Sequence, residues 1–382
     1  MTACPRTIEA AISPSNKMTF LLDWELTMKC NLDCSYCTTG IDGGHDNTTN
    51  HPPVDECLKA LDFMYEYVDI YMSHKPAHSR HVVLNVYGGE SLFHPNIVEL
   101  LEAARSKHVK YKDTWSLTIT TTTNAIVGEN QFRKIVELID EFTVSYHTEN
   151  LPKQKEQFKK NLLLLKEHDK RVKCIVLMHP DNFEDNLDMI DFCTTHDIKH
   201  LPRQLDHGAH DTRFNYKSEQ VIWFDKLYKH KSRASSSLSV EPTTEATNLT
   251  EVGRACCGGR QMVSDQNYSE RQFFVQNKFP DWYCSVNWFF LFVKQVNGNV
   301  FVNKDCKMRF DGTVGPIGNL SDADSILRET RERLSSDTPS IIQCKKELCL
   351  CGLCAPKSKD LDGYTSIMRK YTINQQTLKD IN

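Results

Sequence analysis

The order of its β-like and helical segments constrains the fold of this chain more than any other feature of the sequence. Between residues 18 and 204, short runs rich in apolar and β-favouring residues alternate with segments of helical periodicity. Strand–helix alternation predicts parallel pairing with crossover helices. We therefore expect an α/β protein built on an open, partial (β/α)6 barrel, because six units are too few for the closed eight-stranded barrel.

The expected elements can be placed along the chain from these patterns. The strands are predicted over residues 18–28, His81–Tyr87, Ser116–Thr123, Phe142–Tyr146, Val172–Met178 and Ile198–Gln204. The helices between them are predicted over Val54–Met72, Asn96–Lys107, Asn130–Asp140, Lys153–His168 and Glu184–His196.

The rest of the 382-residue chain has a different composition. Residues 231–253 are polar and rich in Ser and Thr, which is typical of a connection between domains. Residues 254–382 hold eight cysteines and indicate a small α+β module stapled by metal. The predicted organisation is a tail over 1–17, the barrel over 18–230, a linker over 231–253 and the module over 254–382.

Composition excludes several classes of protein. Fifteen cysteines without an N-terminal signal peptide indicate a reducing, cytoplasmic compartment and metal ligation instead of disulfides. No run of about eighteen apolar residues is present, so no membrane segment or membrane partner is expected. A formal net charge of −4 argues against a dedicated nucleic-acid binder.

Three of the cysteines, Cys30, Cys34 and Cys37, follow the first predicted strand with C-x3-C-x2-C spacing. Reactive residues of α/β barrels lie on such loops, at the carboxyl ends of strands. Three thiolates can hold an iron–sulfur cluster that keeps one iron open to a non-protein ligand. Alternatively they are unrelated thiols, or part of a zinc site that takes His45 or His51 as its fourth ligand. The spacing favours the cluster.

A second motif, Tyr87-Gly88-Gly89-Glu90-Ser91, ends the second predicted strand. Two glycines let the backbone approach a ligand closely, and the Glu90 carboxylate can accept hydrogen bonds from an ammonium group. Taken with the cysteine triad and the aromatic Tyr36 before Cys37, this motif resembles the radical S-adenosylmethionine (radical SAM) superfamily. The resemblance implies that Tyr36 lies near the adenine of S-adenosylmethionine, and that Gly88, Gly89 and Glu90 contact its amino group.

The resemblance also implies an activity. A [4Fe–4S] cluster on the three catalytic cysteines would pass an electron to S-adenosylmethionine, giving methionine and a 5′-deoxyadenosyl radical that removes a substrate hydrogen. The electron would come from an external flavodoxin- or ferredoxin-like donor. The cofactor supplies the difficult chemistry in such enzymes, while the protein positions it.

Other residues at predicted strand ends are weaker candidates. Asn124 follows the third strand in a Thr-Asn-Ala segment that resembles the family's Thr-Asn-Gly, but a turn or cap role is equally open. Ser145 matches a position that contacts the cofactor in relatives. His147 could be a substrate group or proton donor, although a structural role is more common for such a histidine. Arg203 and Asp206 could bind a polar substrate or form a surface ion pair.

The C-terminal cysteines indicate a second metal centre. Apolar alternation around Asn297-Gly298 predicts a hairpin that brings Cys284 and Cys306 to neighbouring strand ends. With the tail cysteines Cys344, Cys349, Cys351 and Cys354, this order resembles the SPASM/twitch extension, although the tail spacing is shorter. The resemblance implies one auxiliary [4Fe–4S] cluster, or two if Cys256 and Cys257 take part. A zinc ribbon is the structural alternative.

These features predict a radical SAM enzyme that modifies a peptide or protein side chain. The alternative substrate is a small metabolite such as a sugar, an alcohol or a nucleoside. A non-catalytic, metal-stapled binding protein is a third class, but the Gly-Gly-Glu motif beside a three-cysteine loop counts against it.

Overall fold

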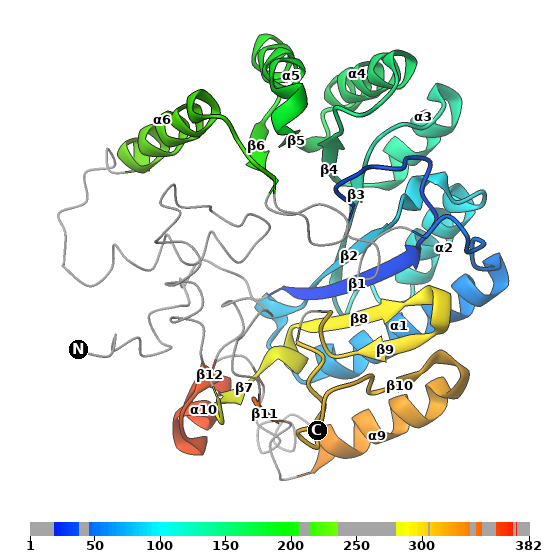
Figure 1. The fold of residues 1–382 in the computed structure, drawn as a ribbon. Helices are drawn as coiled ribbons and strands as arrows, with labels where there is room; N and C mark the ends of the chain where they lie inside the picture. The colour runs from blue at the N-terminus through cyan, green and yellow to red at the C-terminus, as the bar shows by residue number, and fades with distance from the viewer. Residues whose placement is uncertain are drawn as a thin grey trace, which may run out of the picture.

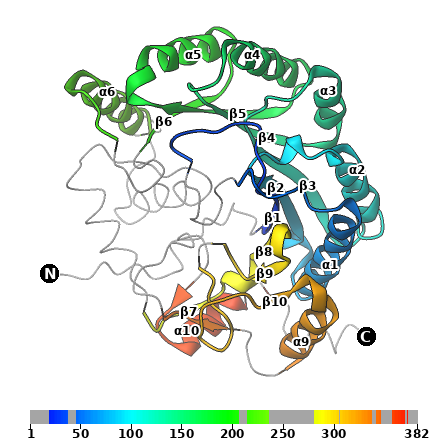
Figure 2. The ribbon, with the colours of Figure 1, turned by 45° about the vertical axis from the view of Figure 1, so that its right-hand side comes forward.

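The computed structural model describes residues 19–37, 46–205, 214–235, 280–304, 306–336, 341–345, 357–369 and 372. Its centre is a curved sheet with helices along the outer side (Figures 1 and 2). Six strands follow one another in the sheet in chain order and run parallel. They are β1 (Phe20–Thr27), β2 (His81–Gly88), β3 (Ser116–Thr123), β4 (Glu141–Tyr146), β5 (Arg171–Met178) and β6 (His200–Gln204).

Each of these strands is followed by a helix before the next parallel strand or after the last. The helices are α1 (Val54–Ser73), α2 (Ile97–His108), α3 (Glu129–Leu138), α4 (Pro152–Glu167), α5 (Phe183–Thr195) and α6 (Ser218–Ser235). The predicted α/β fold with a mostly parallel sheet is confirmed. α6 was not predicted, and it includes residues 231–235 of the predicted linker; residues 236–253 lie outside the described part of the chain.

Alternation along the strands separates the two faces of the sheet. In β1, Phe20, Leu22, Trp24 and Leu26 are buried in the apolar core shared with α1. The residues between them, including Asp23 and Glu25, face the concave side. The core therefore lies between the sheet and the helices, and the inner face carries polar groups.

The sheet continues past β1 into the C-terminal part of the chain. β8 (Phe290–Lys294) pairs in parallel with β1. β9 (Asn299–Phe301) pairs antiparallel with β8, and β10 (Gly318–Asn319) pairs antiparallel with β9. The predicted hairpin is present between β8 and β9, with Gly298 at a φ of +69° in its turn. The C-terminal part thus shares one nine-stranded sheet with the barrel.

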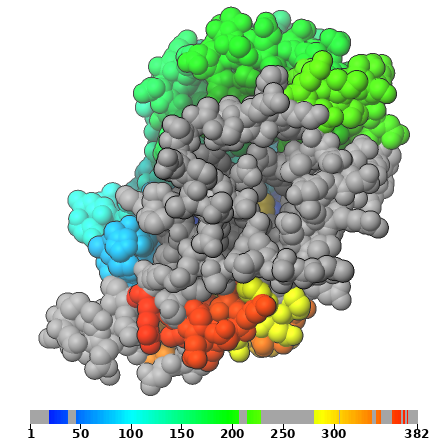
Figure 3. Space-filling view, turned by 90° about the vertical axis from the view of Figure 1, so that its left-hand side faces the viewer, coloured from blue at the N-terminus to red at the C-terminus, as the bar shows by residue number. Residues whose placement is uncertain are grey.

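A second, three-stranded sheet holds part of the C-terminal cysteine group. It consists of β7 (Tyr283–Cys284) between β11 (Ile342–Gln343) and β12 (Lys357–Ser358). Two further helices, α9 (Ala323–Ser335) and α10 (Leu361–Met368), complete this part of the chain. Figure 3 shows α6 and α10 at opposite ends of one face of the molecule. Within the described residues, no helix has the length and apolar character to cross a membrane.

Candidate active site

The cysteine loop begins where β1 ends, at the carboxyl edge of the parallel sheet. Cys30, Cys34 and Cys37 are half-buried there. The backbone N–H of Cys37 donates to the carbonyl of Cys34 at 3.0 Å, which closes a turn around two of the three sulfurs. The N–H of Cys30 donates to Asn47 Oδ1 at 2.9 Å. The loop is therefore fixed at one end by a hydrogen bond to a side chain and at the other by a hydrogen bond within its own backbone.

The glycine pair lies directly against this loop. The N–H of Gly89 donates to the carbonyl of Thr27 at 2.7 Å. A Cβ at Gly88 would stand 2.0 Å from the Thr27 oxygen, and one at Gly89 would stand 2.4 Å from the Met28 oxygen. Any larger residue would push the two segments apart. The close approach that requires glycine here is between two parts of the chain, the end of β2 and the start of the cysteine loop.

Glu90 is a buried hydrogen-bond acceptor and is 1% exposed. Its Oε1 accepts from the Thr123 hydroxyl at 2.7 Å and from the Leu92 N–H at 3.0 Å, and its Oε2 accepts from the Asn124 N–H at 2.6 Å. Burial raises the pKa of Glu90 to about 7, against the opposing effect of these three donors. The carboxylate therefore joins the end of β2 to the end of β3.

Asn124 connects the end of β3 to the cysteine loop. Its Nδ2 donates to Asn31 Oδ1 at 2.7 Å and lies 3.9 Å from Cys30 Sγ, while its Oδ1 accepts from the Ile126 N–H at 2.9 Å. A turn contact and a contact to the loop thus occur together in one side chain. Ala125, the departure from Thr-Asn-Gly, has a φ of +53°, in the left-handed region that favours glycine.

His147 lies beside the second half of the loop. Its Nδ1 is 2.9 Å from the Tyr36 hydroxyl and 3.3 Å from Cys34 Sγ. The imidazole and the Tyr36 ring are parallel, with centroids 5.8 Å apart. Burial lowers the pKa of His147 to about 4, so the ring is neutral at pH 7. Ser145, two residues earlier on β4, is half-buried opposite Ile175 of β5.

Sequence analysis missed Glu149, which makes the strongest polar contact to the second half of the loop. It accepts the Ser35 N–H at 2.8 Å and the Ser35 hydroxyl at 2.5 Å. His179 and Phe214, also unpredicted, lie against the Tyr36 ring at centroid distances of 5.9 and 6.5 Å. Nothing in the local sequence marks these residues, because each reaches the loop from a distant part of the chain.

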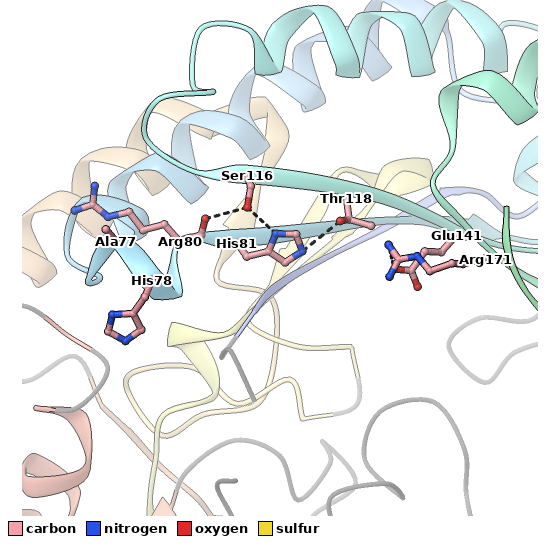
Figure 4. A pocket seen from close by; sticks show the side chains of 8 residues that line it. All are labelled: Ala77, His78, Arg80, His81, Ser116, Thr118, Glu141 and Arg171. Carbon is pink, nitrogen blue, oxygen red and sulfur yellow. Dashed lines mark hydrogen bonds and ion pairs between the residues drawn. The ribbon is translucent and has the colours of Figure 1, made fainter. Parts of the chain in front are cut away.

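The remaining predicted residues lie further along the rim or outside the described residues. Arg203 is exposed on β6, opposite Leu177 of β5. Asp206 and His45 are outside the described part of the chain. A pocket of about 350 Å³ lies at the opposite, amino end of the sheet (Figure 4). Its lining includes His81, Ser116, Glu141 and Arg171, the first residues of four neighbouring strands, and none of the predicted site residues.

Residues 24–193 match the family model of the radical SAM superfamily. The chain contains a radical SAM domain. The matched span runs from β1 through most of α5, and it includes the cysteine loop and the Gly88–Glu90 segment.

Solved structures of similar outline also exist. Native anSMEcpe with bound AdoMet is 13% identical, with a TM-score of 0.48 over 92% of this chain and 96% of that one. Native anSMEcpe with bound AdoMet and Cp18Cys peptide is 12% identical, with a TM-score of 0.47 over the same shares. No curated protein matches this chain.

The donor set of the radical SAM domain fits an iron–sulfur cluster. Burial raises the pKa of the Cys30 and Cys34 thiols to about 12, so these groups bind as thiolates only where a metal supplies positive charge. The Leu32 N–H donates to Cys30 Sγ at 3.4 Å, and hydrogen bonds to cysteine sulfur are one way in which proteins tune such clusters.

His51, the histidine of the zinc alternative that the structure describes, contacts the end of β1: its Nδ1 lies 3.1 Å from the Thr27 hydroxyl. Among the residues that the structure describes, no three metal-binding side chains gather closely enough to hold a single ion.

The C-terminal cysteines that are described lie outside the radical SAM domain and deeper in the protein. Cys284 and Cys306 belong to one small apolar cluster with Val286, Val302, Met308 and Ile342. Cys284 pairs with Ile342 across β7 and β11, and Cys344 lies two residues beyond Ile342, diagonal to Cys284 on the same face. Cys256, Cys257, Cys349, Cys351 and Cys354 are outside the described residues.

Proposed function

We propose that this protein is a radical SAM enzyme in which Cys30, Cys34 and Cys37 hold a [4Fe–4S] cluster and S-adenosylmethionine binds at the open iron. When bound, the cluster supplies the electron that cleaves the sulfonium of S-adenosylmethionine. The observation that carries the proposal is the assembly of the three thiols, the glycine pair and Asn124 at one edge of a parallel sheet, within a radical SAM domain.

The chain's own residues support this assignment by what they do at the rim. The glycine pair lets the end of β2 reach the start of the cysteine loop, where the N–H groups of Gly89 and Glu90 donate to the carbonyls of Thr27 and Lys29. Glu90 and Asn124 lock the ends of β2 and β3 to that loop. Tyr36 offers an aromatic ring backed by His147, which suits stacking on an adenine. Ser145 lies on the inner face below them.

For the substrate we propose a peptide or protein side chain, the role that the resemblance to the SPASM group favours. In that group the electron donor would be an external flavodoxin- or ferredoxin-like protein. We also propose that His147 and Arg203 face the substrate. His147 would do so from its position beside Tyr36 and Cys34.

A small polar metabolite is a second candidate, because the inner face of the sheet is polar below the cysteine loop. Asn85 Nδ2 donates to Asp23 Oδ1 at 2.8 Å, and the Thr120 hydroxyl donates to Asn85 Oδ1 at 3.3 Å. Across β8 and β1, Lys294 forms an ion pair with the buried Glu25. Such a row suits a hydroxyl-rich or zwitterionic molecule better than an apolar side chain.

We also propose one auxiliary [4Fe–4S] cluster on Cys284 and Cys306 with two of the four tail cysteines. Support comes from the shared burial of Cys284 and Cys306 and from the position of Cys344 directly after the neighbouring strand β11. Buried thiols close together in an apolar environment are suited to a closed centre with four protein ligands.

Anaerobic reconstitution with iron and sulfide tests the proposed function. We expect iron near eight atoms per chain, as two four-iron clusters require, and 5′-deoxyadenosine formed from S-adenosylmethionine on reduction with dithionite. Stoichiometric zinc without cleavage of S-adenosylmethionine would overturn the proposal. The substrate class is tested by adding either a mixture of short peptides or a mixture of sugars and nucleosides labelled with deuterium. Deuterium appearing in 5′-deoxyadenosine identifies the class.

A further inference from the structure

We propose that Glu149 is a positioning residue for the radical SAM cluster: it fixes the Cys34–Cys37 half of the cysteine loop, and its negative charge lowers the reduction potential of the bound cluster. This inference rests on the proposed function, because it takes the triad to be the site of an iron–sulfur cluster.

The contact is bidentate and falls on Ser35, one of the two residues that join Cys34 to Cys37. Ser35 lies between Cys34 and Cys37. Its N–H donates to Glu149 Oε2 at 2.8 Å, and its hydroxyl donates to Glu149 Oε1 at 2.5 Å. Two hydrogen bonds to one carboxylate fix the rotation of Ser35 as well as its position, and bonds to an ionised acceptor are the stronger kind.

The two halves of the loop are held by different chemistry. The first half is held by neutral amides, through Asn124 to Asn31 and through Asn47 to the Cys30 N–H. The second half is held from the segment after β4, by Glu149 and by His147 beside Cys34. Glu149 therefore differs from the amide contacts by adding a charge, and that charge stands next to two of the three cluster ligands.

A carboxylate at this place affects the electron affinity of the centre. Net charge and hydrogen bonding around the sulfurs set the potential of iron–sulfur clusters. Reduction adds an electron to a centre that already faces a negative charge, so the charge disfavours reduction. His179 Nε2 lies 3.9 Å from Glu149 Oε1, and its ring also lies against that of Tyr36, with centroids 5.9 Å apart. A lower potential matches the demanding reduction of a sulfonium.

The test uses the full-length chain, reconstituted anaerobically, in five forms besides wild type, one of them the double variant of Glu149→Ala with Ser35→Ala. Glu149→Gln removes the charge and keeps an acceptor, Glu149→Ala removes both, and Ser35→Ala removes one donor. Glu137→Gln is the matched control, because Glu137 is an exposed carboxylate paired with His168 Nδ1 on neighbouring helices, away from the loop. Readouts are iron retained against EDTA, the potential from an EPR titration, and the unfolding midpoint of the iron-free chain. The rim cluster is identified as the one whose EPR signal changes on addition of S-adenosylmethionine.

We expect Glu149→Ala to lower cluster retention by about 10- to 100-fold, as is usual when a residue that orients metal ligands is removed. Glu149→Gln should retain more iron than Glu149→Ala, and its cluster should have a more positive reduction potential than the wild-type cluster. Ser35→Ala should lose less than Glu149→Ala, and the double variant should match Glu149→Ala alone, because both remove one interaction. Glu137→Gln should match wild type in every readout.

The inference is overturned if both Glu149 variants match wild type in iron retention and in potential, even where wild type cleaves S-adenosylmethionine. It is also overturned if they change only the unfolding midpoint. A wild-type chain that holds a cluster but forms no 5′-deoxyadenosine overturns the proposed function alone, since retention and potential still decide the role of Glu149. A wild-type chain that takes up no iron overturns both.

Discussion

The two ends of the parallel sheet are built from the same strands but hold polar groups in opposite ways. At the carboxyl end, polar side chains bond to one another and to the backbone around three half-buried thiols, and Glu90 alone accepts three hydrogen bonds. At the amino end, Lys75 is 1% exposed, and its ammonium has no hydrogen-bond acceptor among the described residues. Its Nζ instead lies 4.7 Å from the centre of the Phe289 ring and 5.4 Å from that of Phe20.

The two ends differ in what their contacts determine. Polar contacts at the carboxyl end fix the direction of the groups that face a ligand, which is the requirement of a catalytic rim. The aromatic rings around Lys75 close the base of β1 and β8, and such contacts act on stability. We therefore expect substitutions at the carboxyl end to change activity, and substitutions at the amino end to change the free energy of unfolding. Four substitutions test this contrast.

The largest effect is expected for Cys34→Ala. Loss of one of three ligands should abolish formation of 5′-deoxyadenosine, while the free energy of unfolding of the iron-free chain changes by less than about 1 kcal/mol, because Cys34 is only half-buried. Product is measured by chromatography and stability by urea unfolding. Cys57→Ala is the control: Cys57 is buried in α1, so this variant should lose about 1 kcal/mol of stability and keep full activity. If Cys34→Ala still cleaved S-adenosylmethionine, the Cys34 thiol would not be required for the reaction.

The second expectation concerns Lys75→Met at the amino end. Burial lowers the pKa of Lys75 from 10.5 to about 7, so between these pH values the unfolded chain binds more protons at this site than the folded chain. The free energy of unfolding of wild type should therefore rise with pH in that window, by up to about 1.4 kcal/mol per pH unit. The methionine variant lacks this dependence and should be the more stable protein at pH 7, with unchanged cleavage of S-adenosylmethionine.

The measurement is urea unfolding of both proteins at intervals from pH 7 to 10.5. The stability advantage of the methionine variant should shrink as the pH rises, because wild type gains what it lacked. Lys59→Met, on the exposed side of α1, is the control for the loss of one positive charge. A constant difference between Lys75→Met and wild type across this window would show that Lys75 is not buried as a neutral amine.

Glu90→Gln is expected to change both activity and stability, because this residue at the carboxyl end also holds two strands together. Glutamine keeps one acceptor for the Thr123 hydroxyl and the Leu92 N–H, but it places an amide N–H₂ opposite the Asn124 N–H. Leaving that buried donor unsatisfied should cost about 1–3 kcal/mol. Urea unfolding measures the loss, and cleavage of S-adenosylmethionine should fall with it. A fall in activity without a loss of stability would show that the carboxylate binds S-adenosylmethionine and does not hold the two strands together.

The contrast between the two ends also marks what the sequence could predict. The strand Ser116–Thr123 was predicted with its observed limits, and the other five parallel strands within two residues at each end, because buried faces and turns leave local patterns. The glycine pair and Glu90 were found as a motif, yet their immediate partners, Thr27 and Thr123, belong to other strands. Motif recognition therefore located the rim without giving its contacts.

Contacts between distant segments left no such pattern. The pairing of Leu21 with Phe290 joins residues far apart in the chain, and neither segment shows which edge it will occupy. Glu149 resembles any other loop carboxylate until Ser35 stands beside it. Asn47 stands in an ordinary polar run, yet its side chain accepts the Cys30 N–H. Lys75 is a common surface residue type, and its burial follows from the β1–β8 pairing.

The smallest effect is expected for Ala125→Gly, at the position where the sequence departs from Thr-Asn-Gly. A φ of +53° costs alanine roughly 1 kcal/mol, which glycine would recover. Glycine also loses a buried methyl group and gains freedom in the unfolded chain, and the second effect alone opposes the gain by about 0.4–1 kcal/mol. The free energy of unfolding should therefore change by less than about 1 kcal/mol, with cleavage of S-adenosylmethionine unchanged. Ala60→Gly, at a buried position inside α1, is the matched control and should cost about 1 kcal/mol or more by urea unfolding. Equal losses in the two variants would mean that residue 125 does not adopt the left-handed backbone in solution, and that the alanine is no departure from what this turn requires.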